Sequence, residues 1–597
     1  MRFTTRPEIT GTFGVCTSTH WIASTVGMAM LEKGGNAFDA AVAMGFVLTV
    51  VEPHLCGPLG DLPAIYHKAG DDAPVVVCGQ GVAPAAATIE HYQSEGLDMV
   101  PGSGMLATVV PGAFDGWMLM LRDHGVLSLR TVLEPAIHYA EAGHPVLERV
   151  EWSIAGLADF FKAEWPTSAA TWLPGGSAPK AGTLFKNPAL AATWTRLLSE
   201  AEAAQGREAQ IEAARAAFYR GFVAEAIDAF VRATVVMDAA GGRRRGVLTG
   251  DDLAGWSASY EAPVSVDYQD WTVFKTGAWG QGPSLLQSLQ LLEGTDIGAV
   301  DPNGADFVHL VTEAMKLSFA DRETYYGDPA EGSVPLDALL SRAYADARRA
   351  LIGERASTTF RPGTVPGYAG WVNAAKVRAA SRPAHAASGI GAGEPTMAHL
   401  SLHRSDTVHI DVIDRHGNMV SATPSGGWLQ SSPVIPALGM PLNSRAQMFW
   451  LEQGRPSSLA PGRRPRTTLS PALASHQGCP VLVFGTPGGD QQDQWQLMMF
   501  LRLVHHNQNL QEAIDAPLFH TGHLQSSFYP RAIKLGHLMI ERTFGEPVIS
   551  ALRARGHDLE IAEPWTVGRL TAAMRDPDGL LRAGATPRLM QAYAVGR

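Results

Sequence analysis

Thr407 begins a segment whose residue types could carry out nucleophilic chemistry. Val408, Ile410 and Val412 alternate with polar side chains, which predicts a half-buried strand that starts at Thr407. Residues 419–423 then predict the returning strand after a turn. A threonine hydroxyl is a weak nucleophile near neutral pH unless a base removes its proton, and an α-amino group on the same residue has a pKa of about 8. A cut before Thr407 would create that base.

The polar face of this predicted strand carries Thr407, His409 and Asp411. The stretch before it, residues 357–394, is rich in Ala, Gly, Ser, Pro and Arg and has no sustained apolar period, which indicates a mobile connector. A flexible tether that leads into a rigid strand is what self-cleavage would need. On spacing alone, a threonine at the start of a strand is usually structural, so both interpretations stay open here.

A glycine-rich turn downstream could stabilise a developing negative charge. Residues 480–484 predict a strand, Gly485 to Gly489 a turn, and residues 490–507 a helix. Free backbone N–H groups and the positive end of a helix dipole meet at such a junction, which suits an oxyanion. Small hydroxyls at Thr423 and Ser425, and the pair Thr467 and Thr468, are further candidates for a polar site.

Composition limits the classes of function. The 597 residues are 46% hydrophobic and 18% charged, so the chain is globular, either as several domains or as one large layered core. A net charge of -11 argues against nucleic acid and anionic membranes as partners. The 20 histidines show no metal-ligand spacing, and neither a phosphate-binding loop nor a serine elbow is present. We therefore expect no metal and no cofactor.

The four cysteines and the N-terminal sequence indicate an intracellular setting. The cysteines have no paired spacing, which predicts free thiols. The first residues lack the apolar core of a signal peptide, and no stretch reaches the roughly 18 charge-free apolar residues of a membrane span. We expect a cytoplasmic protein.

Several elements that would position the site can be predicted. Two helical patterns between Ile22 and Val51 are separated by Gly34-Gly35, and Asn36 is placed as the N-cap of the second. This second helix is apolar on all sides, which predicts a helix buried between layers. Residues 64–67 and 74–78 predict a hairpin. The chain is helix-rich before residue 357 and strand-rich after Thr407.

Several motifs occur together in the order of a known family. They are Gly34 to Ala43, Val51-Glu52-Pro53-His54, Val110 to Ala113, Phe319-Ala320-Asp321-Arg322, Asp406-Thr407-Val408-His409, Pro461 to Pro465, Ser470-Pro471 and Gly485 to Gly489. On these residues the chain resembles the γ-glutamyltransferase family of N-terminal-nucleophile hydrolases, over most of its length. The resemblance implies an α+β fold, a four-layer αββα sandwich of two central sheets between helices.

The resemblance also implies self-cleavage between Asp406 and Thr407. The products would be a large subunit, residues 1–406, which ends in a flexible connector over about 357–405, and a small subunit, residues 407–597. The two would stay interlocked as one fold. An oligomer of such processed heterodimers stays open.

Catalytic roles follow from the resemblance position by position. Thr407 would attack the acyl carbonyl with its own α-amino group as base, and the amides of Gly488 and Gly489 would form the oxyanion hole. Ser425 stands where the family has a threonine whose hydroxyl contacts the nucleophile. Thr467 and Thr468 replace a serine pair that helps to hold the carboxylate end of the substrate.

The departures from the family pattern concern substrate recognition. Gln80 stands where transferases acting on glutathione have an arginine for the glutamyl α-carboxylate, and Met448 stands where an aspartate would hold the α-amine. Each lost charge-assisted contact is worth about 1.5–3 kcal/mol. Arg445, where the family often has glutamine, adds a cation. The sequence therefore predicts a small-molecule amide whose acyl part lacks the amino-acid head, with a carboxylate that Arg445 could read.

This prediction places the chain near the family branch of cephalosporin-type acylases and of amidohydrolases acting on small oxo-acid amides. Two alternatives remain. The first is a true γ-glutamyltransferase or glutathione hydrolase that binds the glutamyl head through other residues. The second is an unprocessed, inactive relative that binds a ligand and in which Thr407 is structural.

Overall fold

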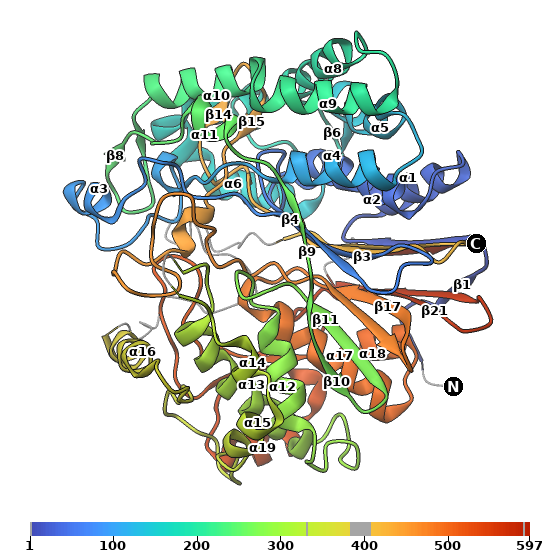
Figure 1. The fold of residues 1–597 in the computed structure, drawn as a ribbon, viewed down its shortest axis with the longest axis vertical. Coiled ribbons are helices and arrows are strands. Elements are labelled where there is room, and N and C mark those ends of the chain that lie inside the picture. Colours follow the sequence, from blue (N-terminus) through green and yellow to red (C-terminus); the bar gives the residue numbers. More distant parts are fainter. Residues whose placement is uncertain (1–2, 330–331, 382–406, 589–591) are drawn as a thin grey trace.

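The computed structural model describes residues 3–329, 332–381, 407–588 and 592–597. Within them, two seven-stranded antiparallel sheets stack face to face, and helices cover the outer face of each (Figure 1). This is the predicted four-layer αββα sandwich. Outside the two large sheets are the short pairs β5 (His144–Pro145) with β6 (Leu184–Phe185), β7 (Val236–Met237) with β8 (Arg243–Arg244), and β14 (Val434–Ile435) with β15 (Met440–Pro441), and the three-stranded sheet β18 (Phe519–Thr521), β19 (His537–Glu541) and β20 (Asp558–Ala562).

The Thr407 sheet is the one that contains the strand following Thr407. In spatial order its strands are β23 (Tyr593–Gly596), β2 (Gly14–Ser18), β12 (Ile410–Asp414), β13 (Met419–Ala422), β3 (Leu62–His67), β4 (Val75–Gly79) and β9 (Ser259–Glu261). The β3–β4 hairpin and the β12–β13 hairpin agree with the sequence prediction.

The glycine-turn sheet is the second large sheet and contains the strand that leads into the glycine-rich turn. In spatial order its strands are β1 (Ile9–Gly11), β22 (Leu581–Ala585), β21 (Thr571–Arg575), β17 (Cys479–Gly485), β16 (Ala472–His476), β11 (Trp271–Lys275) and β10 (Val264–Tyr268). β12 packs on β17 and β21 of this sheet, so the two sheets meet directly beneath the nucleophile segment.

Helices from the first half of the chain cover the Thr407 sheet, with α1, α2 and α4 lying directly on its strands. They are α1 (Trp21–Glu32), α2 (Ala37–Val51), α3 (Ile89–Ser94), α4 (Ala113–His124), α5 (Leu129–Ala142), α6 (Glu148–Glu164), α7 (Pro166–Trp172), α8 (Pro188–Ala201), α9 (Arg207–Tyr219), α10 (Phe222–Ala233) and α11 (Gly250–Ala254). This layer is the upper part of Figure 1.

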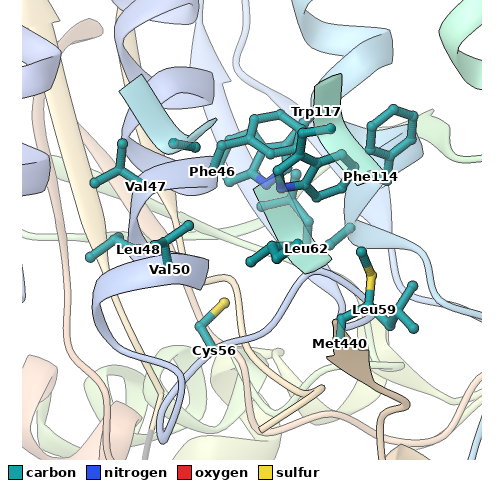
Figure 2. Close-up of a cluster of buried hydrophobic side chains, with 14 of the residues drawn as sticks. Phe46, Val47, Leu48, Val50, Cys56, Leu59, Leu62, Phe114, Trp117 and Met440 are labelled. Atoms are coloured by element: carbon teal, nitrogen blue, oxygen red, sulfur yellow. The ribbon is translucent and has the colours of Figure 1, made fainter. Parts of the chain in front are cut away.

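The α2 helix forms where the sequence predicts it and is buried along its whole length. The Asn36 side chain accepts hydrogen bonds from the first-turn amides, and the Asp39 carboxylate accepts one from the Asn36 amide, so a capping box fixes the start of the helix. Phe46 and Val47 of α2 belong to the apolar cluster shown in Figure 2, together with Trp117 of α4. Because both faces of α2 are apolar, the helix can lie in the middle of its layer with neighbours on every side.

Helices on the other side cover the glycine-turn sheet. They are α12 (Pro283–Leu292), α13 (Ala305–Tyr325), α14 (Leu336–Leu339), α15 (Arg342–Arg349), α16 (Ala369–Ser381), α17 (Gln492–His506), α18 (Leu510–Asp515) and α19 (Glu546–Arg555). None of the helices in the described ranges is both long and apolar enough to span a bilayer. Cys16, Cys56 and Cys78 are buried free thiols and Cys479 is an exposed one, as their spacing predicted.

Three local predictions are wrong. β12 starts at Ile410 rather than at Thr407. It is buried on both faces instead of one, because the second sheet covers the polar face that alternation alone assigns to solvent. Part of the predicted connector, Ala369–Ser381, is the helix α16, whose many alanines concealed its apolar face. Residues 357–368 of the connector form neither helix nor strand, and residues 382–406, which include Asp406, lie outside the described residues.

The two predicted subunits are interlocked. In the Thr407 sheet, β2 from the first part of the chain lies between β23 and β12, both from the part after Thr407. In the glycine-turn sheet, β10 and β11 continue a row of strands formed by residues after Thr407. A cut before Thr407 would therefore leave both sheets built from both products.

Candidate active site

The nucleophile candidate lies just before β12 and faces the residue predicted to support it. Thr407 Oγ1 is 3.2 Å from Ser425 Oγ, and both residues are fully buried. Between them, the Val408 amide donates to the Pro424 carbonyl at 3.4 Å. The contact continues the β12–β13 pairing beyond the strand ends, so the sheet register brings the two hydroxyls together.

A loop from residues 55–61 supports Ser425 from behind. Asp61 and Ser425 exchange backbone hydrogen bonds of 2.7 and 3.1 Å. A Cβ at Gly60 would lie 2.0 Å from the Ser425 carbonyl oxygen, and one at Gly57 would lie 1.8 Å from the Gly427 carbonyl oxygen. This loop can approach so closely only because both positions are glycine.

The predicted strand, glycine turn and helix are present as β17, a short 3-10 turn η4 (Gly489–Gln491) and α17. Gly488 and Gly489 both have positive φ, 136° and 54°, and a Cβ at Gly488 would meet the Trp495 ring at 2.2 Å. The turn starts beside the nucleophile segment, because Gly485 lies against the imidazole of His409. The oxyanion role of the Gly488 and Gly489 amides stays a prediction.

A buried ion pair fixes the far side of the glycine turn. Arg322, from the Phe319 to Arg322 motif, pairs with Asp490, which also accepts from Ser527 Oγ at 2.6 Å. Arg322 also donates to Gln281 at 2.8 Å, and Gln281 donates to the Gly489 carbonyl at 3.1 Å. These contacts orient the Gly489 peptide from two directions.

Thr467 and Thr468 lie next to the same turn. The Thr467 amide donates to the Trp279 carbonyl at 2.8 Å, which connects this pair to the segment that carries Gln281. Both threonines are fully buried, and Thr468 Oγ1 has no hydrogen-bond partner among the described residues. A buried hydroxyl without a partner is costly, so this oxygen is suited to bind a substrate.

Arg445 is paired with a carboxylate, whereas the sequence suggested a cation available to the substrate. Its Nε donates to Asp61 Oδ2 at 2.6 Å, its guanidinium lies 4.9 Å from the Trp428 ring centre, and both charged side chains are fully buried. Burial raises the pKa of Asp61 to about 7, against the opposing effect of the Arg445 charge. The sequence could not show this pair because 384 residues separate its members.

Gln80 and Met448 lie in the interior, as expected for residues that replace charged ligands. Gln80 is buried, its Nε2 reaches only the neighbouring Gly81 carbonyl at 3.5 Å, and its Oε1 has no partner among the described residues. Met448 ends the buried 3-10 turn η3 (Arg445–Met448). Asn443 holds the start of that turn, because its side chain donates to the Leu59 carbonyl at 2.9 Å.

Ion pairs hold the basic stretch before Thr467 in place. Arg464 pairs with Glu261 and Asp328, and Arg466 pairs with Glu323 at 3.0 Å. Burial alone would raise the pKa of Glu323, but Arg466 and three further arginines lower it to about 2. Glu323 therefore stays ionised and anchors the loop that carries the threonine pair.

One group of side chains among the described residues has the composition of a metal site. His309, Glu313 and His557 place three possible ligand atoms within 4.8 Å of one another. Both carboxylate oxygens of Glu313 are already engaged, one by Lys316 at 2.7 Å and one by Arg361 at 3.0 Å. These two cations oppose a divalent ion, so the group fits a hydrogen-bonded cluster better than a metal centre.

Sequence reasoning missed three residues near the nucleophile. Asp61 pairs with Arg445, and His409 and Asp411 form a buried hydrogen bond of 2.9 Å directly behind Thr407. Alternation did place His409 and Asp411 on the face of Thr407. That they are buried could not be seen, because the covering strands come from elsewhere in the sequence.

Comparison with known proteins identifies the family of this chain. The family description Gamma-glutamyltranspeptidase matches residues 23–596. The acylase ACY 1 proenzyme of Pseudomonas sp. (strain SE83) is 32% identical over 587 residues, covering 96% of this chain and 92% of the relative. The solved structure of LmbA2991HD is 51% identical and superposes with a TM-score of 0.93 over 100% of both chains. The cephalosporin acylase of Bacillus halodurans is 28% identical, with a TM-score of 0.82, over 100% of this chain and 98% of that one.

These similarities cover nearly the whole chain. The protein is therefore an enzyme that acts on amide bonds. The chain belongs to the γ-glutamyltransferase family of N-terminal-nucleophile hydrolases, in a divergent branch related to acylases.

Proposed function

We propose that the protein is an amidohydrolase or acyltransferase whose substrate is an amide with an acyl group that lacks the free amino-acid head of a γ-glutamyl compound. The observation that carries the chemistry is the buried contact between Thr407 Oγ1 and Ser425 Oγ. The observation that supports the substrate class is the buried ion pair between Arg445 and Asp61, and we take Gln80 and Met448 to stand in place of the family's charged ligands.

Processing would create the active nucleophile. Thr407 Oγ1 attacks the carbonyl carbon of residue 406, and the peptide C–N bond gives way to an ester while the nitrogen takes up a proton. Water then hydrolyses the ester, leaving a carboxylate on residue 406 and a free α-amino group on Thr407. Ser425 Oγ is placed to hydrogen-bond the attacking oxygen in this step.

Turnover would use the same atoms. The α-amino group of Thr407 accepts the hydroxyl proton as Oγ1 attacks the substrate carbonyl, and the Gly488 and Gly489 amides stabilise the oxyanion. The C–N bond breaks, the amine leaves with the proton, and an acyl ester remains on Thr407. Water, or an acceptor amine, then releases the acyl group.

The acyl pocket disfavours a zwitterionic amino-acid head. The side-chain oxygen of Gln80 can accept a hydrogen bond but cannot neutralise an α-carboxylate, and Met448 offers an α-ammonium group no counter-charge. The Asp61–Arg445 pair has no net charge while Asp61 is ionised. Gln80 Oε1 and Thr468 Oγ1 are two buried polar atoms that an uncharged polar acyl group could satisfy.

A panel of acyl p-nitroanilides with one common leaving group tests this proposal. We expect kcat/KM for the best of the glutaryl, oxamyl and simple aliphatic acyl compounds to exceed that for the γ-glutamyl compound by about 100-fold or more, from two lost contacts of about 1.5–3 kcal/mol each. If the γ-glutamyl compound is the best substrate, the protein is a true γ-glutamyltransferase or glutathione hydrolase.

The remaining alternative, an inactive ligand-binding relative, is tested by denaturing electrophoresis of the pure protein. We expect two fragments that divide at residue 407. A single band at 63.7 kDa that persists after long incubation would support the inactive form.

A further inference from the structure

His409, two residues after the nucleophile candidate, is fully buried between the two sheets with both ring nitrogens hydrogen-bonded. Its Nε2 is 2.9 Å from Asp411 Oδ1, and its Nδ1 is 2.9 Å from Thr423 Oγ1. The three side chains form a continuous chain, Asp411 to His409 to Thr423. None of them is part of the mechanism described above.

The surroundings of Asp411 fix the direction of these hydrogen bonds. Its second oxygen accepts from Thr17 Oγ1 at 3.0 Å and from Thr571 Oγ1 at 2.8 Å. Because Asp411 already acts as an acceptor for these two hydroxyls, we assign the Nε2–H of His409 as the donor in its hydrogen bond with Asp411. In a neutral imidazole Nδ1 is then an acceptor, and it receives the hydroxyl hydrogen of Thr423.

This chain ends beside the nucleophile. Thr407 and His409 are two residues apart on one segment, and Ser425 and Thr423 are two residues apart on the facing segment. The His409–Thr423 contact therefore lies next to the Thr407–Ser425 contact on the same face of the sheet. A shift of Thr423 would move Ser425 relative to the attacking oxygen.

We propose that His409 is a positioning residue, and that the Asp411–His409–Thr423 chain holds the Thr423–Ser425 segment in the register that places Ser425 Oγ against Thr407 Oγ1. This inference rests on the proposed role of Thr407 as the nucleophile. The chain acts in both reactions, because self-cleavage and turnover use the same Thr407 oxygen.

A purely structural role for the network must be distinguished from positioning. The imidazole fills the space next to Gly485, where a Cβ would lie 2.1 Å from His409 Cε1, so removing the ring would leave a cavity and lower stability in either case. The decisive change is therefore made at Thr423, where valine has almost the same shape but no hydroxyl.

Thr423→Val is compared with Thr17→Val, because both remove one fully buried hydroxyl from the same network. Thr17 contacts Asp411 but lies away from Ser425. We expect Thr423→Val to slow self-cleavage and to lower kcat by about tenfold, the effect of one lost hydrogen bond, with KM within about twofold. We expect Thr17→Val to keep kcat within about twofold, although Tm falls in both variants. Equal kcat in the two variants would overturn the proposal.

Conservative variants provide a second test that does not depend on Thr423→Val folding. Thr423→Ser keeps the hydroxyl and should restore kcat. His409→Asn can place an acceptor near the position of Nδ1, whereas His409→Gln reaches only towards that of Nε2, so the asparagine variant should retain the higher kcat. The reverse order would contradict a role through Thr423.

The inference and the proposed function fail in different ways. Kinetics are expressed per Thr407 N-terminus, counted by end-group analysis, so that slow processing does not lower the apparent kcat. If Thr407→Ala is still cut and active, the nucleophile assignment is wrong. If Thr407→Ala is inactive and Thr423→Val matches Thr17→Val in kcat, only the role of His409 is wrong.

Discussion

The nucleophile side and the acyl-recognition side of the site are built in different ways. Thr407, Ser425 and His409 lie directly beyond paired strands, and their contacts include hydroxyls, backbone groups and the Asp411 carboxylate. Arg445 and Gln80 lie outside the strands, and Arg445 forms a buried ion pair with Asp61. Strand register fixes the first group, whereas single side chains define the second.

This difference explains why the chemistry matches the family while the recognition residues depart from it. A one-residue slip between β12 and β13 would place Thr407 and Ser425 on opposite faces of the sheet, so their contact depends on the present register. Arg445 can be replaced without moving a strand, because Asn443 anchors the turn on which it lies. Specificity can therefore diverge without a change in strand register.

The largest effect is expected from Thr407→Ala, on the nucleophile side. The variant should remain a single 63.7 kDa chain and lose activity by about 10⁴-fold or more, because no other oxygen occupies the attacking position. Thr407→Ser should be cut slowly. Electrophoresis and end-group sequencing measure the extent of self-cleavage in both variants. Normal cutting of the alanine variant would show that Thr407 is not the nucleophile.

On the recognition side, Arg445→Met tests the ion pair. It leaves a buried carboxylate unpaired, so the free energy of unfolding should fall by about 3–5 kcal/mol in urea titrations. KM should rise because the side chain proposed to contact the acyl group changes. The proportional fall in kcat should be much smaller than the proportional rise in KM.

The matched control is the double variant Asp61→Asn with Arg445→Met. It removes both charges together and should recover most of the lost stability. A double variant as unstable as the single one would show that Asp61 is not the partner that matters.

A smaller effect is expected from Ser425→Ala, which removes one hydroxyl and leaves the strands intact. The loss of one hydrogen bond to the nucleophile should lower kcat by about tenfold, with little change in KM. Steady-state kinetics on two acyl groups of different size should give the same factor. A change in KM that depends on the acyl group would place Ser425 on the recognition side.

The smallest effect concerns pH. Because burial raises the pKa of Asp61 to about 7, this carboxyl gains a proton between pH 8 and 6 and the pair changes from neutral to a net charge of +1. KM for a glutaryl amide, relative to that for an uncharged acyl amide, should therefore fall about threefold over this range. In Asp61→Asn the ratio should stay flat, and a flat ratio in the unmodified protein would show that Arg445 does not sense the acyl carboxylate.

The sequence predicted the elements with strong local signals. The capping box at Asn36 and the apolar run of α2 specify that helix without help from distant residues, and the alternation in β3 specifies its hairpin. The helix α16 was missed because its small residues give a weak apolar period.

The site was only partly predictable, because several of its contacts join distant parts of the sequence. Thr407 and Ser425 are recognisable from motifs, but the partner of Arg445 depends on a loop 384 residues away. The burial of His409 depends on Gly485, at the end of strand β17 in the other sheet. Contacts of this range leave no mark in a single sequence.

The interlocked sheets have a consequence for the cut protein in dilute solution. The first and last strands of the later product, β12 and β23, enclose β2 of the earlier one, so separating the two chains would break the hydrogen-bonded ladders on both edges of β2. The fragments behave thermodynamically as one molecule with a nicked backbone. Their cohesion should not depend on concentration over the range in which ordinary subunits dissociate, and it should be lost only together with the fold.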